Sequence, residues 1–120
     1  MDMPQPVEIK LKKRSRRLVV RFDDGFEADL DAEYLRVHSP SAEVQGHSAG
    51  EGFLVVGKEN VGIARIEPVG RYAIRIVFDD GHATGLYTWP ILYELGRNRE
   101  RNWARYLERV EKAGKGRAPQ

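Results

Sequence analysis

The sequence contains no cysteine. Without thiols, the chain has no disulfide, no thiolate-bound zinc, no iron–sulfur cluster held by its own sulfurs and no cysteine nucleophile. Four common sources of stability or chemistry are therefore missing. We expect no cysteine-ligated zinc or cluster in this protein.

Long apolar runs are also missing. No stretch approaches the roughly 20 apolar residues that a membrane-spanning helix needs, and residues 1–6 lack the apolar region of a secretory signal peptide. The 120 residues have the length of one domain, which buries roughly two-thirds of its unfolded surface. We expect a cytoplasmic protein that makes no contact with a membrane.

The motifs of common cofactor and nucleotide sites do not occur either. No histidine begins a His-x-Asp or His-x-Glu motif, so the two-histidine, one-carboxylate iron site of oxygenases is not encoded. The glycine-rich loops that bind phosphates are absent from the sequence. A calcium loop is excluded because Val20 and Phe22 stand where it needs acidic residues. We therefore expect no enzymatic activity and no catalytic residues.

The charge is nearly balanced but unevenly distributed, with 20 Lys and Arg against 18 Asp and Glu. Lys10–Arg17 contains six basic residues, and Asp23–Glu33 follows with six acidic ones. A basic block of this kind can contact the phosphates of nucleic acid. A solvated turn between two strands explains it better, because the acidic stretch cancels its long-range field. Nucleic-acid binding through Lys10–Arg17 is a disfavoured second alternative.

The spacing of apolar residues predicts short strands that follow one another by tight turns, with a few helices. Such connections favour antiparallel pairing. The predicted fold class is α+β: a small two-layer fold with a mostly antiparallel sheet. The first expected elements are the strands Val7–Lys12, Leu18–Phe22 and Phe26–Leu30 and a helix Asp31–Arg36, which is capped by Asp31 and ended by Ser39-Pro40-Ser41. After a loop Gln45–Gly52, we expect the strands Phe53–Val56 and Val61–Glu67, a turn Pro68-Val69-Gly70 and a strand Tyr72–Phe78.

The turn after Phe22 can be predicted in detail. A two-residue loop would pair buried with solvated positions, so we predict a three-residue loop, Asp23-Asp24-Gly25. Gly25 then takes the left-handed backbone position that disfavours a side chain. The resulting pairs are Phe22 with Phe26, Val20 with Ala28 and Leu18 with Leu30.

This turn occurs twice. Phe78-Asp79-Asp80-Gly81 repeats Phe22-Asp23-Asp24-Gly25 at an offset of 56 residues, and a strand and a short helix follow each copy. We infer an internal duplication in which the paired aspartates form turns rather than catalyse. The same three-residue loop in the second copy pairs Phe78 with His82, Ile76 with Thr84 and Ile74 with Leu86.

Two helices are predicted near the end of the chain. The first, Trp89–Leu95, follows Thr88 as its N-cap, has Pro90 in its first turn and ends at Gly96. The second is an amphipathic helix within residues 98–113 that packs on the domain formed by residues 1–97, and residues 114–120 are expected to be a disordered tail. Its apolar face contains Trp103, Tyr106, Leu107 and Val110.

Three histidines are the candidate metal ligands: His38, His47 and His82. His82 takes the place that Phe26 has in the first copy. A histidine there is usually a rim residue bonded to a backbone carbonyl, but a neutral imidazole is also the commonest metal ligand. Either iron or zinc would suit such a site. The candidate surface for a protein partner contains Tyr34, Arg36, Trp89 and Tyr93.

Two segments carry a family resemblance: Tyr-Leu-Arg-Val-His-Ser-Pro-Ser-Ala-Glu-Val-Gln-Gly-His at 34–47 and Phe-Asp-Asp-Gly-His-Ala-Thr-Gly-Leu-Tyr-Thr-Trp at 78–89. With them the chain resembles a gamma-butyrobetaine hydroxylase-like N-terminal domain over roughly residues 8–97. The family's module occurs alone in small bacterial proteins of unknown function, fused to Mrp-type P-loop ATPases that carry iron–sulfur clusters, and at the N-terminus of carnitine-pathway dioxygenases. The resemblance implies a small two-layer α+β fold.

In those dioxygenases, the related domain holds a structural zinc with three cysteines and one histidine. The resemblance puts the cysteine positions at Ser39, Ser41 and Val44, and the histidine position at His82. A hydroxyl is a poor zinc ligand and valine is none, so the site is not inherited as it stands. The oxygenase domain is absent as well, and we do not expect its activity.

Three functions follow as hypotheses. The first is a non-catalytic adaptor or regulatory module linked to iron–sulfur or other metalloprotein machinery, with a protein partner such as an Mrp-type P-loop ATPase. The second is a metal-binding domain that uses His82 with His38 or His47. The third is nucleic-acid binding through the basic block.

Overall fold

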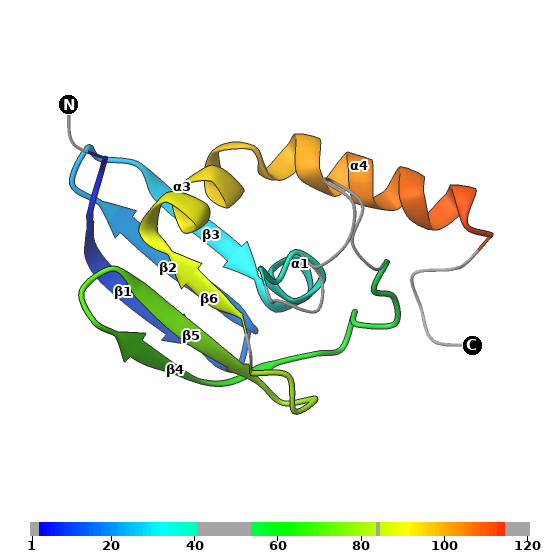
Figure 1. The fold of residues 1–120 in the computed structure, drawn as a ribbon, viewed down its shortest axis with the longest axis horizontal. Helices are drawn as coiled ribbons and strands as arrows, with labels where there is room; N and C mark the ends of the chain where they lie inside the picture. Colours follow the sequence, from blue (N-terminus) through cyan, green and yellow to red (C-terminus); the bar gives the residue numbers. More distant parts are fainter. Residues whose placement is uncertain (1–2, 41–53, 84, 115–120) are drawn as a thin grey trace.

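A unit of three strands and a helix occurs twice in the chain, and one longer helix follows it. This arrangement is seen in a computed structural model that describes residues 3–40, 54–83 and 85–114. The first half contains β1 (Pro6–Lys12), β2 (Arg17–Phe22), β3 (Glu27–Asp31) and α1 (Ala32–Val37); the second half contains β4 (Ile63–Val69), β5 (Ala73–Phe78), β6 (Leu86–Thr88) and α3 (Trp89–Arg97); α4 (Arg99–Lys112) comes last (Figure 1).

Each half forms its own antiparallel sheet, with strand order β1-β2-β3 in one and β4-β5-β6 in the other. Helix α3 continues from β6 but packs against β3, so the second half's helix covers the first half's sheet (Figure 1). One cluster of buried side chains contains strand residues of both sheets together with Leu92 and Leu95 of α3. The predicted α+β class is confirmed, but its strands are divided between two sheets.

The first Asp-Asp-Gly turn has the predicted register. Leu18 lies opposite Leu30, Val20 lies opposite Ala28, and the Phe22 N–H donates to the Phe26 carbonyl at 2.8 Å. Gly25 and Gly81 have φ angles of 90° and 93°. The left-handed glycine predicted for both turns is therefore confirmed.

The second turn begins with the predicted pair, since the Phe78 N–H donates to the His82 carbonyl at 2.9 Å. Further along, Ile74 lies opposite Tyr87, not Leu86. The predicted Ile74–Leu86 pair is therefore wrong by one residue. Tyr87 is fully buried, so the shift turns the larger aromatic side chain into the core. The predicted partner of Ile76, residue 84, lies outside the described residues.

The segment before β4 is not a strand. Residues 54–56 have no strand pairing, and the Val55 carbonyl instead accepts a hydrogen bond from the Tyr106 hydroxyl at 2.7 Å. The predicted strand Phe53–Val56 is therefore wrong for the part that the structure describes. The next strand begins two residues later than predicted and extends through Val69, so the turn predicted from Pro68 comes later. Residue 53, the predicted loop 45–52 and residues 115–120 lie outside the described ranges.

Both N-caps were predicted correctly, because Asp31 accepts from the Tyr34 N–H and Thr88 from the Ile91 N–H. Gly96 does not end α3 as predicted, since the helix runs on to Arg97. A Cβ on Gly96 would lie 2.6 Å from the Ala28 Cβ. Glycine is needed there because α3 approaches β3 closely, not because the backbone turns.

The C-terminal helix α4 lies within its predicted limits. Tyr106 and Val110 are buried, and the Tyr106 ring stacks on Trp103 at 5.0 Å between centroids. Leu107 does not belong to this face as predicted, because it is 40 % exposed. Figure 1 shows α4 extending away from the two sheets, past α1.

The duplication extends further than the repeated turn. Both first strands, β1 and β4, have a register irregularity two residues after they begin. The N–H groups of Asp23 and Asp79 each donate to the carbonyl of the residue before that strand, Gln5 and Gly62. The N–H of that residue in turn donates to the aspartate side chain in both halves. These shared details indicate that the two halves are copies of one β-β-β-α unit.

Candidate functional site

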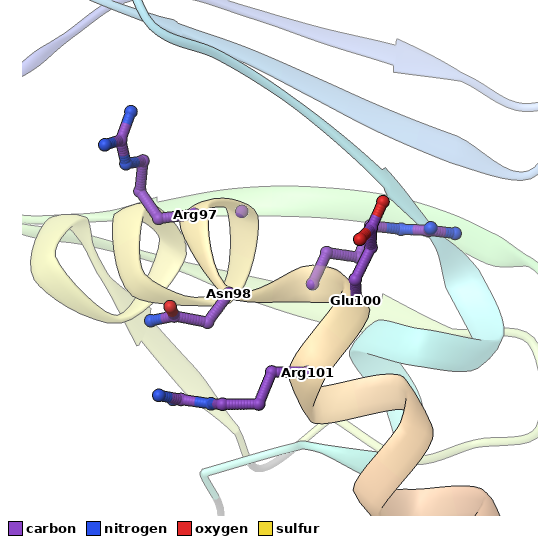
Figure 2. Close-up of a pocket in the computed structure, with 6 residues that line it drawn as sticks. Arg97, Asn98, Glu100 and Arg101 are labelled. Carbon is purple, nitrogen blue, oxygen red and sulfur yellow. The ribbon is translucent and has the colours of Figure 1, made fainter.

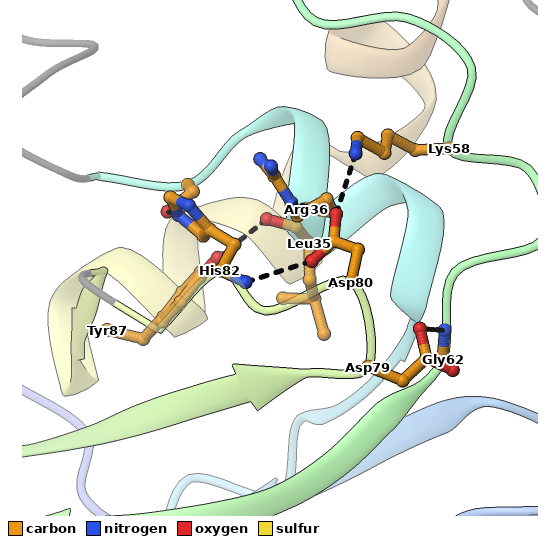
Figure 3. Close-up of polar contacts among 9 residues, drawn as sticks. Leu35, Arg36, Lys58, Gly62, Asp79, Asp80, His82 and Tyr87 are labelled. Carbon is orange, nitrogen blue, oxygen red and sulfur yellow. Dashed lines mark hydrogen bonds and ion pairs between the residues drawn. The ribbon is translucent and has the colours of Figure 1, made fainter.

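The second turn is the centre of a polar cluster that joins the two halves. The Asp80 carboxylate accepts from Arg36 Nε at 2.9 Å and from Lys58 Nζ at 2.7 Å. Arg36 comes from α1, and Lys58 precedes β4 (Figure 3). The Arg36, Asp80 and Lys58 side chains are only 13 %, 21 % and 24 % exposed. Two cations therefore hold one largely covered carboxylate.

The electrostatics of Asp80 follow from these partners. Burial alone would raise the pKa of its carboxyl group. The hydrogen bonds from Lys58, from the His82 N–H and from Arg36 outweigh that effect and lower the pKa to about 2. Asp80 is consequently an ionised structural acid near neutral pH, and its pKa is unsuited to general acid–base catalysis at that pH.

His82 follows the turn and contacts Ser39, which comes just after α1, and Phe78 of β5. Its backbone N–H donates to Asp80 Oδ1 at 3.1 Å, its Nε2 lies 2.9 Å from Ser39 Oγ, and its ring lies 6.1 Å from the Phe78 ring. Figure 3 shows it beside Tyr87, whose hydroxyl donates to the Leu35 carbonyl. His82 therefore connects the second turn to the end of the first half.

Ser39 is not placed to act as a nucleophile, although a histidine contacts its hydroxyl. The residue is only 2 % exposed, and a Cβ on Gly85 would clash with its Oγ. Its neighbour Tyr87 is fully buried, which raises the pKa of the tyrosine hydroxyl. A substrate carbonyl has no room to approach this oxygen.

The first turn makes the reciprocal contact with the second half. Asp24 accepts from the Phe26 N–H at 2.9 Å and from the Tyr93 hydroxyl of α3 at 2.6 Å. The Tyr93 hydrogen bond is the main reason that the pKa of Asp24 is lowered. Tyr93 and Arg36 are each the fifth residue after their helix N-cap. Each helix thus bonds the turn aspartate of the other half.

The other candidate ligands lie in different surroundings. His38 ends α1 with Nδ1 2.9 Å from the Tyr34 carbonyl, and burial lowers its pKa. His47 lies outside the described residues. Among residues 3–40, 54–83 and 85–114, no three His, Cys, Asp or Glu side chains gather closely enough to hold a metal ion.

The candidate partner surface is largely internal. Tyr34 is fully buried and donates its hydroxyl to the Leu95 carbonyl at 2.6 Å, so its prediction as a surface residue is wrong. Arg36 and Tyr93 are engaged with the turn aspartates. Trp89 is half-buried, and its Nε1 donates to the Arg71 carbonyl at 2.7 Å. Tyr72, which the prediction missed, is 55 % exposed.

An open pocket lies at the junction of α3 and α4, where its lining runs from Gly96 to Arg101 (Figure 2). Its three arginines are already engaged: Arg97 lies over the Phe26 ring at 5.2 Å, Arg99 binds Asp31 at 2.6 Å, and Arg101 binds Glu94 at 3.4 Å. Figure 2 shows the Arg97 and Arg101 side chains extending apart. This pocket does not present converging free charges to a ligand.

Comparison with known proteins identifies the family. The sequence model described as "Gamma-butyrobetaine hydroxylase-like, N-terminal" matches residues 9–93. The chain belongs to this family. No curated protein matches it closely.

Solved structures agree with this gamma-butyrobetaine hydroxylase-like fold. One NMR solution structure is 50 % identical, covering 99 % of this chain and 94 % of that one with a TM-score of 0.86. A second is 49 % identical, covering 98 % and 88 % with a TM-score of 0.83. A crystal structure of a protein of unknown function in the DUF971 family, from Acidithiobacillus ferrooxidans ATCC 23270, is 39 % identical, covering 77 % and 92 % with a TM-score of 0.65.

Two positions that the family resemblance makes zinc ligands meet in this structure. Ser39 and His82 are 43 residues apart in sequence and in hydrogen-bond contact. Ser41 and Val44 lie outside the described residues. The structure therefore brings these two positions together, with a hydroxyl where the resemblance implies a thiolate. The described residues contain no helix that could span a membrane.

Proposed function

We propose that this protein is a non-catalytic, protein-binding module of the cytoplasm. The observation that supports this best is how the chemistry-bearing side chains are used. Asp24, Asp79, Asp80, His82 and Ser39 all bond other parts of the same chain. All of them except Asp79, which bonds Gly62 of its own half, join the two halves, and this structural use favours surface recognition over catalysis.

The turn between β4 and β5 is a suitable recognition surface. Tyr72 is exposed there. Trp89 is held beside it, because the backbone N–H of Trp89 donates to the Tyr72 carbonyl. Tyrosine, tryptophan and arginine are enriched among residues that dominate protein interfaces. Arg71 lies in the same turn and is exposed. The rigid hairpin would present these side chains without a large loss of conformational entropy.

The proposed partner is iron–sulfur or other metalloprotein machinery, in particular an Mrp-type P-loop ATPase. The family resemblance supports this choice, because related modules are fused to such ATPases. A domain that is covalently fused in one protein commonly meets the same partner as a separate chain in another. The expected association is transient, since the described surface has only isolated exposed apolar side chains.

Binding between the purified protein and the Mrp-type ATPase of the same cell tests this proposal. We expect saturable binding by calorimetry, weakened about tenfold by Tyr72→Ala, as is typical of an interface aromatic. Val7→Ala is the matched control, because Val7 is 56 % exposed and lies on β1. The proposal fails if wild-type protein binds neither this ATPase nor any metalloprotein recovered by cross-linking in cells.

A metal site is the second candidate function. The contact between His82 and Ser39 supports it, because the resemblance places ligands at both positions. His82 would bind iron or zinc together with His38 or His47, and neutral imidazoles are required, so affinity should fall below about pH 6.5. Iron and zinc binding to wild type and His82→Asn, at pH values above and below this, tests the site. Equal binding by both proteins removes His82 from it.

A further inference from the structure

The turn between β1 and β2 is a compact basic surface, which we call the basic tip and define as Lys12–Arg16. Four of its five residues are cationic, and all five are exposed. None of the four makes an ion pair with another described residue. The cations on either side of the tip are different, because Lys10 binds Glu8 and Arg17 binds Asp29. The free positive charge is thus confined to the turn.

The acidic residues that follow in sequence do not neutralise the basic tip. Asp23 and Asp24 come after β2, so they lie at its opposite end, about 20 Å away for a six-residue strand. That separation exceeds the Debye length of about 8 Å at physiological ionic strength. Asp31, which lies opposite Arg17, is already bound by Arg99. Arg16 is the tip cation closest to another acid, because a Cβ on Gly62 would lie 2.7 Å from Asp79 Oδ2 and 3.9 Å from Arg16 Cγ. The acids that follow the tip in sequence therefore leave Lys12, Lys13 and Arg14 without an ion pair among the described residues.

The backbone of the tip is held in a conformation that does not suit arginine. Arg16 has a φ of 58° and is the one non-glycine residue with positive φ in the part of the chain that the structure describes. Its N–H donates to the Lys13 carbonyl, and its carbonyl accepts from the Ala32 N–H at the start of α1. Glycine would occupy this position with less strain. An arginine there gives the tip a fourth charge at some cost in stability, as functional sites often do.

We propose that the basic tip docks an acidic segment of a protein partner. This inference rests on the proposed function and names the chemistry of the partner. A nucleic-acid duplex fits less well, because the cations on β1 and β2 beyond the tip are neutralised and cannot extend a phosphate-binding surface. The tip also has no aromatic side chain on which bases could stack. A short run of Glu or Asp matches its size and charge.

A fluorescein-labelled poly-glutamate peptide is the probe, and fluorescence anisotropy at two salt concentrations is the measurement. We expect salt-sensitive binding that Lys12→Gln/Lys13→Gln/Arg14→Gln weakens about tenfold or more. Arg16→Gly should weaken binding severalfold while the melting temperature stays the same or rises, because the strain is removed. Arg105→Gln/Lys112→Gln is the control, since it removes exposed charges on α4 and should leave binding unchanged.

Three outcomes overturn the inference: equal binding by the triple variant, equal loss in the control, or tighter binding of a labelled DNA duplex than of the peptide at the same salt. The triple variant also separates this inference from the proposed function. If it still binds the Mrp-type ATPase as wild type does, the tip is not the docking site and the proposed function stands. If wild type binds the peptide but no metalloprotein, the proposed function fails.

Discussion

The two Asp-Asp-Gly turns share one backbone framework but differ in what lines them. In the first half, Phe26 follows the turn and stacks on Phe22, while Gly96 of α3 lies against the Phe26 ring. Arg97 adds its guanidinium over the same ring at 5.2 Å. The lining of this turn is therefore apolar and aromatic.

In the second half, the equivalent places are polar. His82 replaces Phe26, and Ser39 replaces Gly96, since each is the eighth residue after its helix N-cap. The apolar version closes its turn with the same backbone hydrogen bond, from the Phe22 N–H to the Phe26 carbonyl, and has the same positive-φ glycine. The framework consequently does not need a histidine or a hydroxyl. The polar lining of the second half is the part of the duplication that has the character of a specific site.

The largest effect should come from the aromatic residue before each turn. Phe22 and Phe78 are 1 % and 2 % exposed, so Phe22→Ala and Phe78→Ala should each lower the free energy of unfolding by about 3–5 kcal/mol. Similar losses, measured by urea denaturation, are expected if the two halves share one core. Tyr72→Ala is the control and should change stability little. If only one of the two substitutions lowered the free energy of unfolding, the phenylalanine of the other half would contribute little to the core.

Gly96→Ala tests the close contact between the halves. Changing an ordinary glycine inside a helix to alanine raises the free energy of unfolding by about 1 kcal/mol. Here the new Cβ would lie 2.6 Å from the Ala28 Cβ. We therefore expect overpacking to lower the free energy of unfolding by about 1–3 kcal/mol in total. Gly114→Ala, which meets no atom within 4 Å but has positive φ, separates steric from backbone effects. Stabilisation by Gly96→Ala would contradict the packing described above.

The Asp80 cluster should make the second turn sensitive to acid. Its pKa of about 2 lies below the ordinary value of 3.8. The ionised carboxylate therefore stabilises the fold above about pH 4, and this contribution is lost as the pH falls towards 2. Asp80→Asn should cost about 1 kcal/mol near neutral pH, because the ion pairs are partly solvated.

Unfolding measured from neutral pH to pH 2 should show the difference between wild type and Asp80→Asn disappear in that acidic range. Asp24→Asn is the matched change in the first half. It removes one hydrogen bond from a neutral tyrosine rather than two ion pairs, so a smaller effect is expected. A difference that persists at pH 2 would mean that Asp80 acts through its shape and not through its charge.

Most of the first half can be predicted from the sequence, because its strands, turn and helix start are marked by residues that are close to one another in the chain. Period-two alternation and Gly25 are sufficient for the register of β2 with β3, and Asp31 for the start of α1. The predicted pairing of β5 with β6 is wrong because the chain between His82 and Leu86 contains one residue more than the predicted register allows. A short polar segment with a glycine gives no sign of this extra residue in the sequence. The prediction that Gly96 ends α3 is wrong for a different reason, because the role of this glycine depends on its contact with Ala28, which is distant in sequence.

The polar site was predictable only in part. The duplication alone places His82 in the position of Phe26. The ion pair of Arg36 with Asp80 spans 44 residues, and no local pattern indicates that the two halves exchange contacts. The sequence-based prediction for Tyr34 fails because a tyrosine on a short helix gives no sign of a buried carbonyl partner 61 residues away. Contacts between the halves are thus what sequence reasoning missed.

His82→Phe makes the second half resemble the first and should have the smallest effect. The variant loses the hydrogen bond to Ser39 Oγ but keeps the backbone N–H bond to Asp80, and it adds apolar contact with Phe78. These changes oppose each other, so the free energy of unfolding should change by about 1 kcal/mol or less. The reverse exchange, Phe26→His, should cost more, because Gly96 offers no hydroxyl partner for the imidazole. Urea denaturation of both variants measures this asymmetry. A large loss of stability in His82→Phe would mean that the polar lining is needed for folding, whereas a small loss would mean that the fold does not require it.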